Sequence, residues 1–529
     1  MHFPFPLSPL TASAQDPCFS AGSTQAAREY RSLIDHVDVM SRNLYRFWRL
    51  AMARPANEDE GRQMGEAAEA AIEVEGGRLL ERWHEEHLPA LQTHLRRLRE
   101  LETEPLAAAQ GAAVLDELDT IHRDLWVIHF RIVLALGPGM QRFDDFYADI
   151  FGGEEGDGHA LLVGVESESV RAGFGLSDLA ILANDPGLAS LFRDTPLPDL
   201  LARLTTTDSG QTFLDALGAY LEGYGRRQDL IDFMTPTWLE DPTFALSAVR
   251  NYVQTGYDAR TEYAATQRSA ADALAAVREQ LAAYPAAVRE MFEELLQVAR
   301  AAVFLKEEHN YYIDQQAFSS IRLVYLRMGR ALAENGMLRS PDDVFMLRVD
   351  ELPALFTEAP TSDLVEQVRS IVHTRRAQMR IAQTLTPPPF IGPAPTGPPP
   401  ADGLMARARL RMYGGPSQDA AAANEVRGSG GSRGVATGVA HVARTLEEAT
   451  AIRPGEILVT VTTMPAWTPL FGVVAAVVTE TGGPLSHCAI VAREYGVPAV
   501  VGASGATRAI STGQRITVDG GRGIVTIDD

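Results

Sequence analysis

A proline-rich tract divides this chain into two parts of different character. Residues 386–400 read TPPPFIGPAPTGPPP and include eight prolines in 15 residues. Because proline fixes φ and has no backbone N–H, this tract can be neither a helix nor a central strand. It is expected to be extended and semi-rigid, and the Gly- and Ala-rich stretch that follows it is expected to be flexible. We therefore predict a linker arm over residues 386–424 between two domains.

The part before the arm is predicted to be a large α-helical domain over residues 1–385. Segments such as 67–101 repeat apolar residues at intervals of three and four and contain strong helix formers. Proline and glycine should punctuate these helices. The expected breaks are Gly137-Pro138-Gly139, Gly152-Gly153, Asp241-Pro242 and Pro285, with a new helix beginning at Ala286.

The part after the arm, residues 425–529, has a different pattern. Its short apolar runs, such as GEILVTV and QRITVDG, are bounded by Gly, Pro and Asp and indicate strands. One helix is expected among them, from about Ser486 to Tyr495. The predicted fold class is therefore multidomain, with a large α-helical domain followed by a small α/β domain.

Composition narrows the class of protein. Asp and Glu number 69 against 47 Lys and Arg, which gives a formal net charge of −22. A field of that sign repels phosphate backbones and anionic lipid, so we expect no nucleic-acid partner and no membrane partner. Cys18 and Cys488 are too few for a disulfide framework or a Cys-based zinc site, and no metal site is predicted. No targeting segment is visible, so a cytoplasmic location is expected.

Lys306 is the single lysine of the chain, and arginine supplies all the other basic side chains. Arginine cannot replace lysine at every position, because the two side chains differ in shape, hydration and pKa. A single lysine kept in a chain that otherwise uses arginine is therefore a functional candidate. It opens the cluster KEEHNYYID, whose Glu307, His309 and Asp314 add acid–base groups. On a helix end, Lys306, Glu307 and His309 could position a hydroxyl, remove its proton and neutralise a phosphoryl group. A solvated helix end with ion pairs would have the same pattern.

A second chemical signal lies in VVTETGGPLSHCAIVAREYGVPAVVG, residues 477–502. A buried strand is expected to end at Glu480, and a helix to begin near Ser486, which is a suitable N-cap. His487 would then lie on the first helical turn, where the helix dipole favours anions and a neutral imidazole. Neutral imidazole is a nucleophile toward phosphorus. An ordinary capping histidine would share this local pattern.

The wider pattern T-x-G-G-x-x-S-H-x-A-I-V-A-R-E-x-G-x-P-A-V-V-G resembles the phosphohistidine swivelling domain of the phosphoenolpyruvate-utilising enzymes. That family includes phosphoenolpyruvate synthase, pyruvate phosphate dikinase and rifampin phosphotransferase. The resemblance covers residues 425–529 and implies that His487 is the phosphorylated residue. The phosphate-binding residues that it implies are Thr481, Gly482, Gly483, Ser486 and Arg493.

The resemblance also concerns the charging of His487. Family members of full length carry an ATP-grasp domain that needs lysines over the phosphates, and this sequence has only Lys306 and no GxxxxGK[ST] loop. Nor does a barrel for pyruvate chemistry follow His487 before the sequence ends. We therefore expect ATP and Mg²⁺ on a partner ATP-grasp protein, no tightly bound cofactor in this chain, and a substrate other than pyruvate.

The helical domain resembles the acceptor half of rifampin phosphotransferase. Residues 221–242 are similar to a family segment that reads YGHR, then D, P-x-W and D-P, with Arg226 in place of His. Lys306 and Glu307 lie where the family has an Arg-Glu pair near the acceptor. The substrate-binding candidates are His129, Arg226, Arg227, Asp314 and Arg322.

Together these features predict a phosphotransferase component of an ATP-dependent, two-protein system. A phosphoryl group would pass from the ATP-grasp partner to His487, and then to a small-molecule hydroxyl bound in the helical domain. Three alternatives are open: a dehydratase component in which phosphorylation activates the hydroxyl for elimination, a non-catalytic phosphocarrier, and a degenerate binding protein.

Overall fold

The computed structural model describes residues 5–104, 106, 110–152, 156–385, 387–388, 391–392, 407 and 424–528. The chain forms two compact units, each made of several segments. Unit 1 comprises Met1–Ala135, Leu230–Pro236 and Tyr312–Pro399, and unit 2 comprises Leu136–Asp229, Thr237–Tyr311 and Pro400–Asp529. Most of the predicted arm lies outside the described residues, and the domain boundaries read from composition stay a prediction.

Unit 1 is mainly helical. Its first helix follows the N-cap Ser8, whose hydroxyl accepts a hydrogen bond from the Thr11 N–H. Helix α5 and the π-helix η4 continue past the boundary of this unit. The elements are α1 (Pro9–Glu29), β1 (Ile34–Arg42), β2 (Tyr45–Met52), α2 (Glu58–Gly77), α3 (Leu79–Arg82), η1 (Trp83–His87), α4 (Leu88–Thr103), α5 (Gly111–Phe151), η4 (Asn310–Ala317), α13 (Phe318–Glu334), η5 (Pro341–Met346), η6 (Val349–Glu351), α14 (Leu352–Thr357) and α15 (Ser362–Gln383).

The β1–β2 hairpin corrects the sequence reading, which assigned this stretch to helix. The two strands pair in antiparallel register, with Val37 opposite Leu50 and Val39 opposite Trp48. Such β-branched and aromatic side chains favour a pleated strand. The turn is closed at residues 43–44, where both φ angles are positive, as a two-residue hairpin loop requires.

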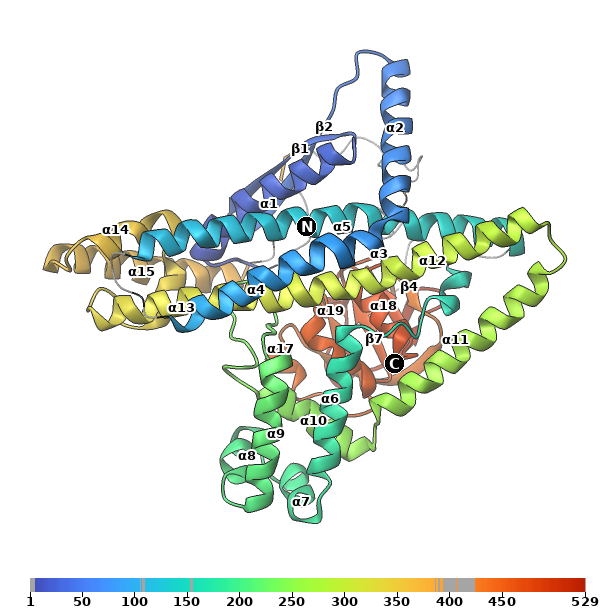
Figure 1. Cartoon of the computed structure of the whole chain (residues 1–529). Helices are drawn as coiled ribbons and strands as arrows, with labels where there is room; N and C mark the ends of the chain where they lie inside the picture. Colours follow the sequence, from blue (N-terminus) through green and yellow to red (C-terminus); the bar gives the residue numbers. More distant parts are fainter. Residues whose placement is uncertain are drawn as a thin grey trace. The chain divides into compact units, whose positions relative to one another are not determined.

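Unit 2 holds the remaining helices and a mixed sheet (Figure 1). Helix α12 begins at Ala286 with Pro285 at its N-cap, as predicted, and α10 begins directly after Pro242. The helical elements before residue 312 are η3 (Asp157–Leu161), α6 (Glu168–Ala183), α7 (Pro186–Asp194), α8 (Leu197–Leu204), α9 (Asp208–Tyr224), α10 (Thr243–Thr255), α11 (Ala259–Leu281) and α12 (Ala286–His309).

The predicted break at Gly137-Pro138-Gly139 is wrong. Helix α5 continues through Pro138 and ends at Phe151, where Gly152 takes a φ of +66°. A Cβ on Gly139 would lie 2.9 Å from the Val298 side chain, so glycine here permits close packing within unit 2. Packing of the long helix therefore outweighs the local cost of proline. Within the described ranges, no helix combines the length and the apolar character that a membrane span requires.

The C-terminal part of unit 2 confirms the predicted α/β fold. Its eight strands lie in the order β3-β10-β9-β5-β6-β7-β8-β4, and the four central strands from β5 to β8 are parallel. The elements are β3 (Glu425–Arg427), β4 (Ser429–Ser432), β5 (Val435–Val442), α17 (Leu446–Ala449), β6 (Ile457–Thr460), η7 (Pro465–Gly472), β7 (Ala476–Thr479), α18 (His487–Glu494), β8 (Ala499–Val501), α19 (Ala506–Ala509), β9 (Arg515–Asp519) and β10 (Ile524–Ile527).

Side chains of the parallel strands alternate between two hydrophobic cores. Ile457 and Val459 of β6 belong to a core made only of residues from this α/β part. Leu458, between them, belongs to a second core that also includes Leu176 of α6 and Val249 of α10. One face of the sheet therefore packs within its own part of the chain, and the other shares a core with the helices of unit 2.

Candidate phosphohistidine site

The site is centred on His487, which is the first residue of α18. Its Nδ1 lies 3.1 Å from Oε1 of Glu307, in the last turn of α12. Both side chains are buried, and Nε2 of His487 has no hydrogen-bond partner among the described residues. The structure therefore brings together two predicted catalytic residues that are 180 positions apart in the chain.

A tight loop holds His487 at the start of its helix. Gly482 has a φ of +100°, and a Cβ at this position would lie 2.9 Å from the Ser486 side chain. Ser486 occupies the N-cap position as predicted, but its buried hydroxyl makes no capping hydrogen bond. Its backbone N–H instead donates to the Gly483 carbonyl at 2.9 Å. Glycine at position 482 is thus required by the turn itself.

Two further predicted phosphate-binding residues brace this loop. The N–H and the hydroxyl of Thr481 both donate to the Val461 carbonyl, at 3.0 and 3.1 Å. The Arg493 guanidinium donates to the carbonyl of Pro484. Cys488, which follows His487, is buried. These contacts keep the loop in place, while Nε2 of His487 and the Ser486 hydroxyl have no hydrogen-bond partner among the described residues.

The Glu307 carboxyl is held in its charged form. Burial acts to raise its pKa, but the charge of His487 and the hydrogen bond from that ring, with a smaller contribution from Lys306, lower it below its ordinary value. When the ring of His487 is neutral, its Nδ1–H donates to this carboxylate and the lone pair lies on Nε2. This arrangement fixes which nitrogen can attack phosphorus.

Two neighbouring carboxyls behave in the opposite way. Burial raises the pKa of Glu308 to about 7, and that of Glu494, at the end of α18, to about 8. Each accepts one backbone hydrogen bond, from the N–H of Glu168 at 2.8 Å and from the N–H of Gly164 at 2.9 Å. The surroundings of the Glu307–His487 pair therefore gain negative charge as pH rises through neutrality.

Glu494→Gln is expected to stabilise the protein at alkaline pH. Since the pKa of Glu494 rises from 4.5 to about 8 on folding, its favourable contribution is present below pH 4.5 and lost as pH rises through 8. The amide oxygen of glutamine can still accept the Gly164 N–H. The unfolding free energy of the variant should exceed that of the wild type by about 2 kcal/mol at pH 9, and the two should match at pH 4. The difference at pH 9 is smaller than the full pKa shift would give, because the Glu494 side chain keeps some contact with solvent.

Urea unfolding at several pH values measures this effect. Exposed Glu447→Gln, on α17, serves as the matched control and should change stability at neither pH. An equal stability of Glu494→Gln and wild type at pH 9 would contradict the burial-driven shift.

A small cavity adjoins the pair. It has a volume of about 20 Å³ and is lined by Glu307, Ser169, Val303, Ile490 and Tyr495, among others. This is room for about one water molecule, not for a substrate. With α18 in this position, the site therefore admits no acceptor beside Glu307.

The other two members of the predicted catalytic cluster differ in their surroundings. Lys306 is partly exposed and contributes charge near Glu307. His309 is fully buried, and its Nδ1 donates to the carbonyl of Leu305, one turn earlier, at 2.7 Å. A solvated helix end is therefore not what the structure shows, since Glu307, Glu308 and His309 are all buried.

The predicted substrate-binding arginines of unit 2 are both buried. Arg226 donates to the carbonyl of Glu222 at 3.5 Å. Arg227 is 1% exposed and lies over three aromatic rings. Neither residue lines the cavity beside Glu307.

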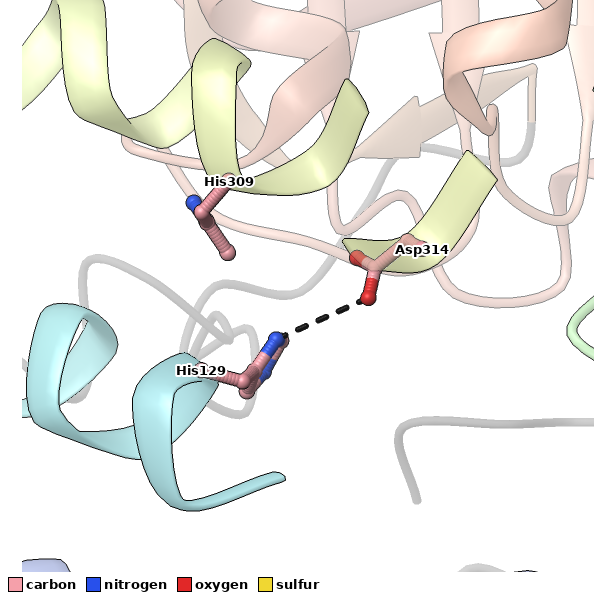
Figure 2. Close-up of side chains that lie close together, drawn as sticks. All are labelled: His129, His309 and Asp314. Carbon is pink, nitrogen blue, oxygen red and sulfur yellow. Dashed lines mark ion pairs between the residues drawn. The ribbon is translucent and has the colours of Figure 1, made fainter. Parts of the chain in front are cut away.

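The other three predicted substrate-binding residues belong to unit 1. His129 Nδ1 and Asp314 Oδ1 form an ion pair at 3.6 Å, which Figure 2 shows as a dashed line. Arg322 is buried, donates to the carbonyl of Phe233 and lies over the ring of Phe345. Arg322 therefore has a structural contact that the sequence does not indicate.

Asp229 is a residue that the sequence reasoning missed. Its carboxylate accepts hydrogen bonds from Nε1 of Trp467, at 2.6 Å, and from the N–H of Leu446, at 2.8 Å. It thus ties the loop after α9 to two elements of the α/β part, η7 and α17. The sequence offered one signal for Asp229: it stands two residues after Arg227, within residues 221–242, which resemble a family segment.

Comparisons with known proteins match both halves of this site. The model of the PEP-utilising enzyme mobile domain matches residues 452–523, which include His487. The model of the rifampicin phosphotransferase fourth domain matches residues 139–307, which end at Glu307. The two matched segments therefore contribute one member each to the His487–Glu307 pair.

Individual relatives agree with these matches. Chondramide synthase cmdD from Chondromyces crocatus is 34% identical over 90% of this chain and 12% of its own length. The uncharacterized phosphotransferase YvkC from Bacillus subtilis (strain 168) is 28% identical over 99% of this chain and 60% of its own length. A rifampicin phosphotransferase from Streptomyces sviceus is 32% identical over 67% of this chain and 39% of its own length. The chain thus spans at most 60% of the length of these relatives.

Proposed function

The chain belongs to the family of phosphoenolpyruvate-utilising enzymes, and we propose from this that it is a phosphotransferase in which His487 carries the phosphoryl group. The phosphoryl group comes from ATP, bound with Mg²⁺ by an ATP-grasp domain outside this sequence. It then passes to a hydroxyl group of a small molecule. The similarity to rifampicin phosphotransferases supports the second transfer.

The observation that carries this proposal is the pairing of His487 with Glu307. Because Nδ1 donates to the carboxylate, Nε2 keeps its lone pair and has no other partner among the described residues. In the charging step Nε2 forms a bond to phosphorus while the bond to the donor oxygen breaks. The N-terminus of α18 offers backbone N–H groups to the transferred oxygens.

In the second step the acceptor oxygen bonds to phosphorus as the Nε2–P bond breaks, and the electron pair returns to the ring. Glu307, once released from Nδ1 of His487, takes the hydroxyl proton, and Lys306 offsets charge on the phosphoryl oxygens. Since the cavity beside Glu307 has only about 20 Å³, the α/β part must move away from α12 before an acceptor can enter. His309 has no part in this scheme.

The small cavity also favours a second candidate, a phosphocarrier whose acceptor is bound by another protein. Such a carrier needs an accessible phosphohistidine but no substrate pocket in this chain. Phosphorylated protein that keeps its label with a panel of hydroxyl compounds, and loses it to a second protein, would support the carrier over the phosphotransferase.

His487→Ala is expected to remove the phosphohistidine at position 487, while labelling of exposed histidines such as His84 and His373 continues. The test needs no partner protein, because phosphoramidate transfers phosphoryl groups directly to nucleophilic imidazoles. The full chain is incubated with phosphoramidate, and ³¹P NMR identifies the nitrogen that is modified. At position 487 the proposal predicts acid-labile label on Nε2 alone.

His441→Ala is the matched control, since His441 is another histidine of the α/β part and pairs with Glu456 at 3.2 Å. It should be labelled like the wild type. Equal total label in His487→Ala and wild type, or label on Nδ1 of His487, would overturn the proposal.

A further inference from the structure

Arg227 is a charged side chain sealed inside unit 2. It is 1% exposed, and its Nε, Nη1 and Nη2 atoms have no hydrogen-bond partner among the described residues. No carboxylate of the described chain forms an ion pair with it. A guanidinium stays charged at any physiological pH, so its five N–H donors are present and unused.

Among the described residues, aromatic rings surround the guanidinium. The guanidinium carbon lies 5.8 Å from the ring centre of Tyr224, 5.7 Å from that of Trp238 and 5.8 Å from that of Tyr311. Cation–π attraction offsets part of the cost of burial, but it leaves the N–H donors without acceptors. A buried charge in this condition indicates a missing partner.

Other unused groups near the arginine are donors as well. The Tyr220 hydroxyl and Nε1 of Trp238 are buried and have no hydrogen-bond partner among the described residues. Trp238 is one of the three rings around Arg227. The centre of the Tyr220 ring lies 5.4 Å from that of Tyr224, which is another, with the two rings tilted by 34°. A ligand that satisfies such a cluster must be rich in acceptors and negatively charged.

The backbone holds this arrangement firmly. The N–H of Arg227 donates to the Gly225 carbonyl at 2.8 Å, and its own carbonyl accepts the Trp238 N–H at 3.0 Å. Helix α6 makes room for the aromatic rings through a glycine, since a Cβ on Gly175 would lie 2.7 Å from the ring of Tyr220. The cluster is therefore preorganised around the arginine and is not a loose surface group.

The α/β part of unit 2 closes over this region. Asp229, two residues beyond Arg227, is bonded to Trp467, and Tyr220 and Trp238 share one hydrophobic core with Trp467 and Phe471. We propose that Arg227, with Tyr220 and Trp238, forms a buried oxyanion site that takes a phosphate or carboxylate group and is sealed when the α/β part docks. None of the residues of this site is His487 or Glu307, and the proposal does not require the proposed function.

The test is the effect of anions on thermal unfolding of the full chain, with inorganic phosphate and acetate as probes at constant ionic strength. Arg227→Met is compared with wild type. A bidentate arginine contact should make the apparent Kd for the preferred anion at least about tenfold tighter in the wild type. Without anion, Arg227→Met should be at least as stable as wild type, because it removes an unpaired buried charge.

Two further variants make the result specific. Arg250→Met is the matched control, since Arg250 is a partly buried arginine of the same unit that donates to the Thr195 carbonyl at 2.7 Å. It and His487→Ala should respond to the anion like the wild type. A response to phosphate alone identifies a phosphoryl ligand, and a response to acetate a carboxylate.

Three outcomes would overturn the proposal. They are a wild type that responds to neither anion, a response that Arg227→Met retains, and a response that His487→Ala loses. The last outcome would place the bound anion at α18. None of these results bears on whether phosphoramidate labels His487, so the two proposals fail separately.

Discussion

Glu307→Ala is expected to slow phosphorylation of His487 by phosphoramidate by about 10²–10⁴-fold, the usual range for loss of a positioned acid–base partner. Without the carboxylate, Nδ1 has no acceptor, so the ring is no longer held with its lone pair on Nε2. Breaking a buried pair by removing one member also costs about 3–5 kcal/mol of unfolding free energy. Labelling kinetics and urea unfolding measure the two effects.

The effect on stability should depend on pH. Because folding lowers the pKa of Glu307, its contribution is present above its ordinary pKa and is lost as pH falls through the folded value. The stability difference between wild type and Glu307→Ala should therefore shrink in acid. Glu307→Gln keeps an acceptor for Nδ1 and should be intermediate in rate.

Glu294→Ala is the control, since Glu294 is an exposed glutamate on the same helix. It should match wild type in both measurements. If Glu307→Ala were labelled at the wild-type rate, the carboxylate would have no positioning role, whatever the change in stability.

Trp467→Ala is expected to lower the unfolding free energy by about 3–5 kcal/mol, as removal of a large buried aromatic does. Trp467 is 2% exposed and lies in the core that the α/β part shares with the helices of unit 2. Its loss should also release α18, which can be followed by faster amide hydrogen exchange of that helix.

A double-mutant cycle separates the hydrogen bond from the apolar contact. Trp467→Phe keeps most of the packing and removes the Nε1 donor, and Asp229→Ala removes its acceptor. The coupling energy between the two changes should be about 1–3 kcal/mol. A coupling near zero would show that Asp229 does not hold the α/β part through Trp467.

The sequence predicted elements where local signals and packing agree. Pro285 before α12 and the short apolar runs of the α/β part are examples, and the fold class was confirmed. It failed where packing overrides a local signal, as at Pro138 inside α5. The β1–β2 hairpin was missed because its alternating residues stand within a long helical composition.

Both members of the central pair could be predicted one at a time, but not their contact. His487 was singled out by a local pattern and Glu307 by a charged cluster, and nothing in either segment indicates the other. Arg227 was a predicted substrate-binding residue, yet the lack of a hydrogen-bond acceptor for its guanidinium among the described residues is a property of the folded chain alone. Asp229 has no motif of its own.

The alternation of Ile457, Leu458 and Val459 between two cores has a consequence for any movement of the α/β part away from the helices of unit 2. The core on one face of the sheet would move with it. The apolar side chains on the opposite face would be exposed to water whenever the α/β part separates from α6 and α10. Water penalises such a bare surface, so a free carrier should be short-lived. Any surface on which the α/β part docks would then need apolar side chains of its own. The shape of that surface would select the docking partner as much as its charge does.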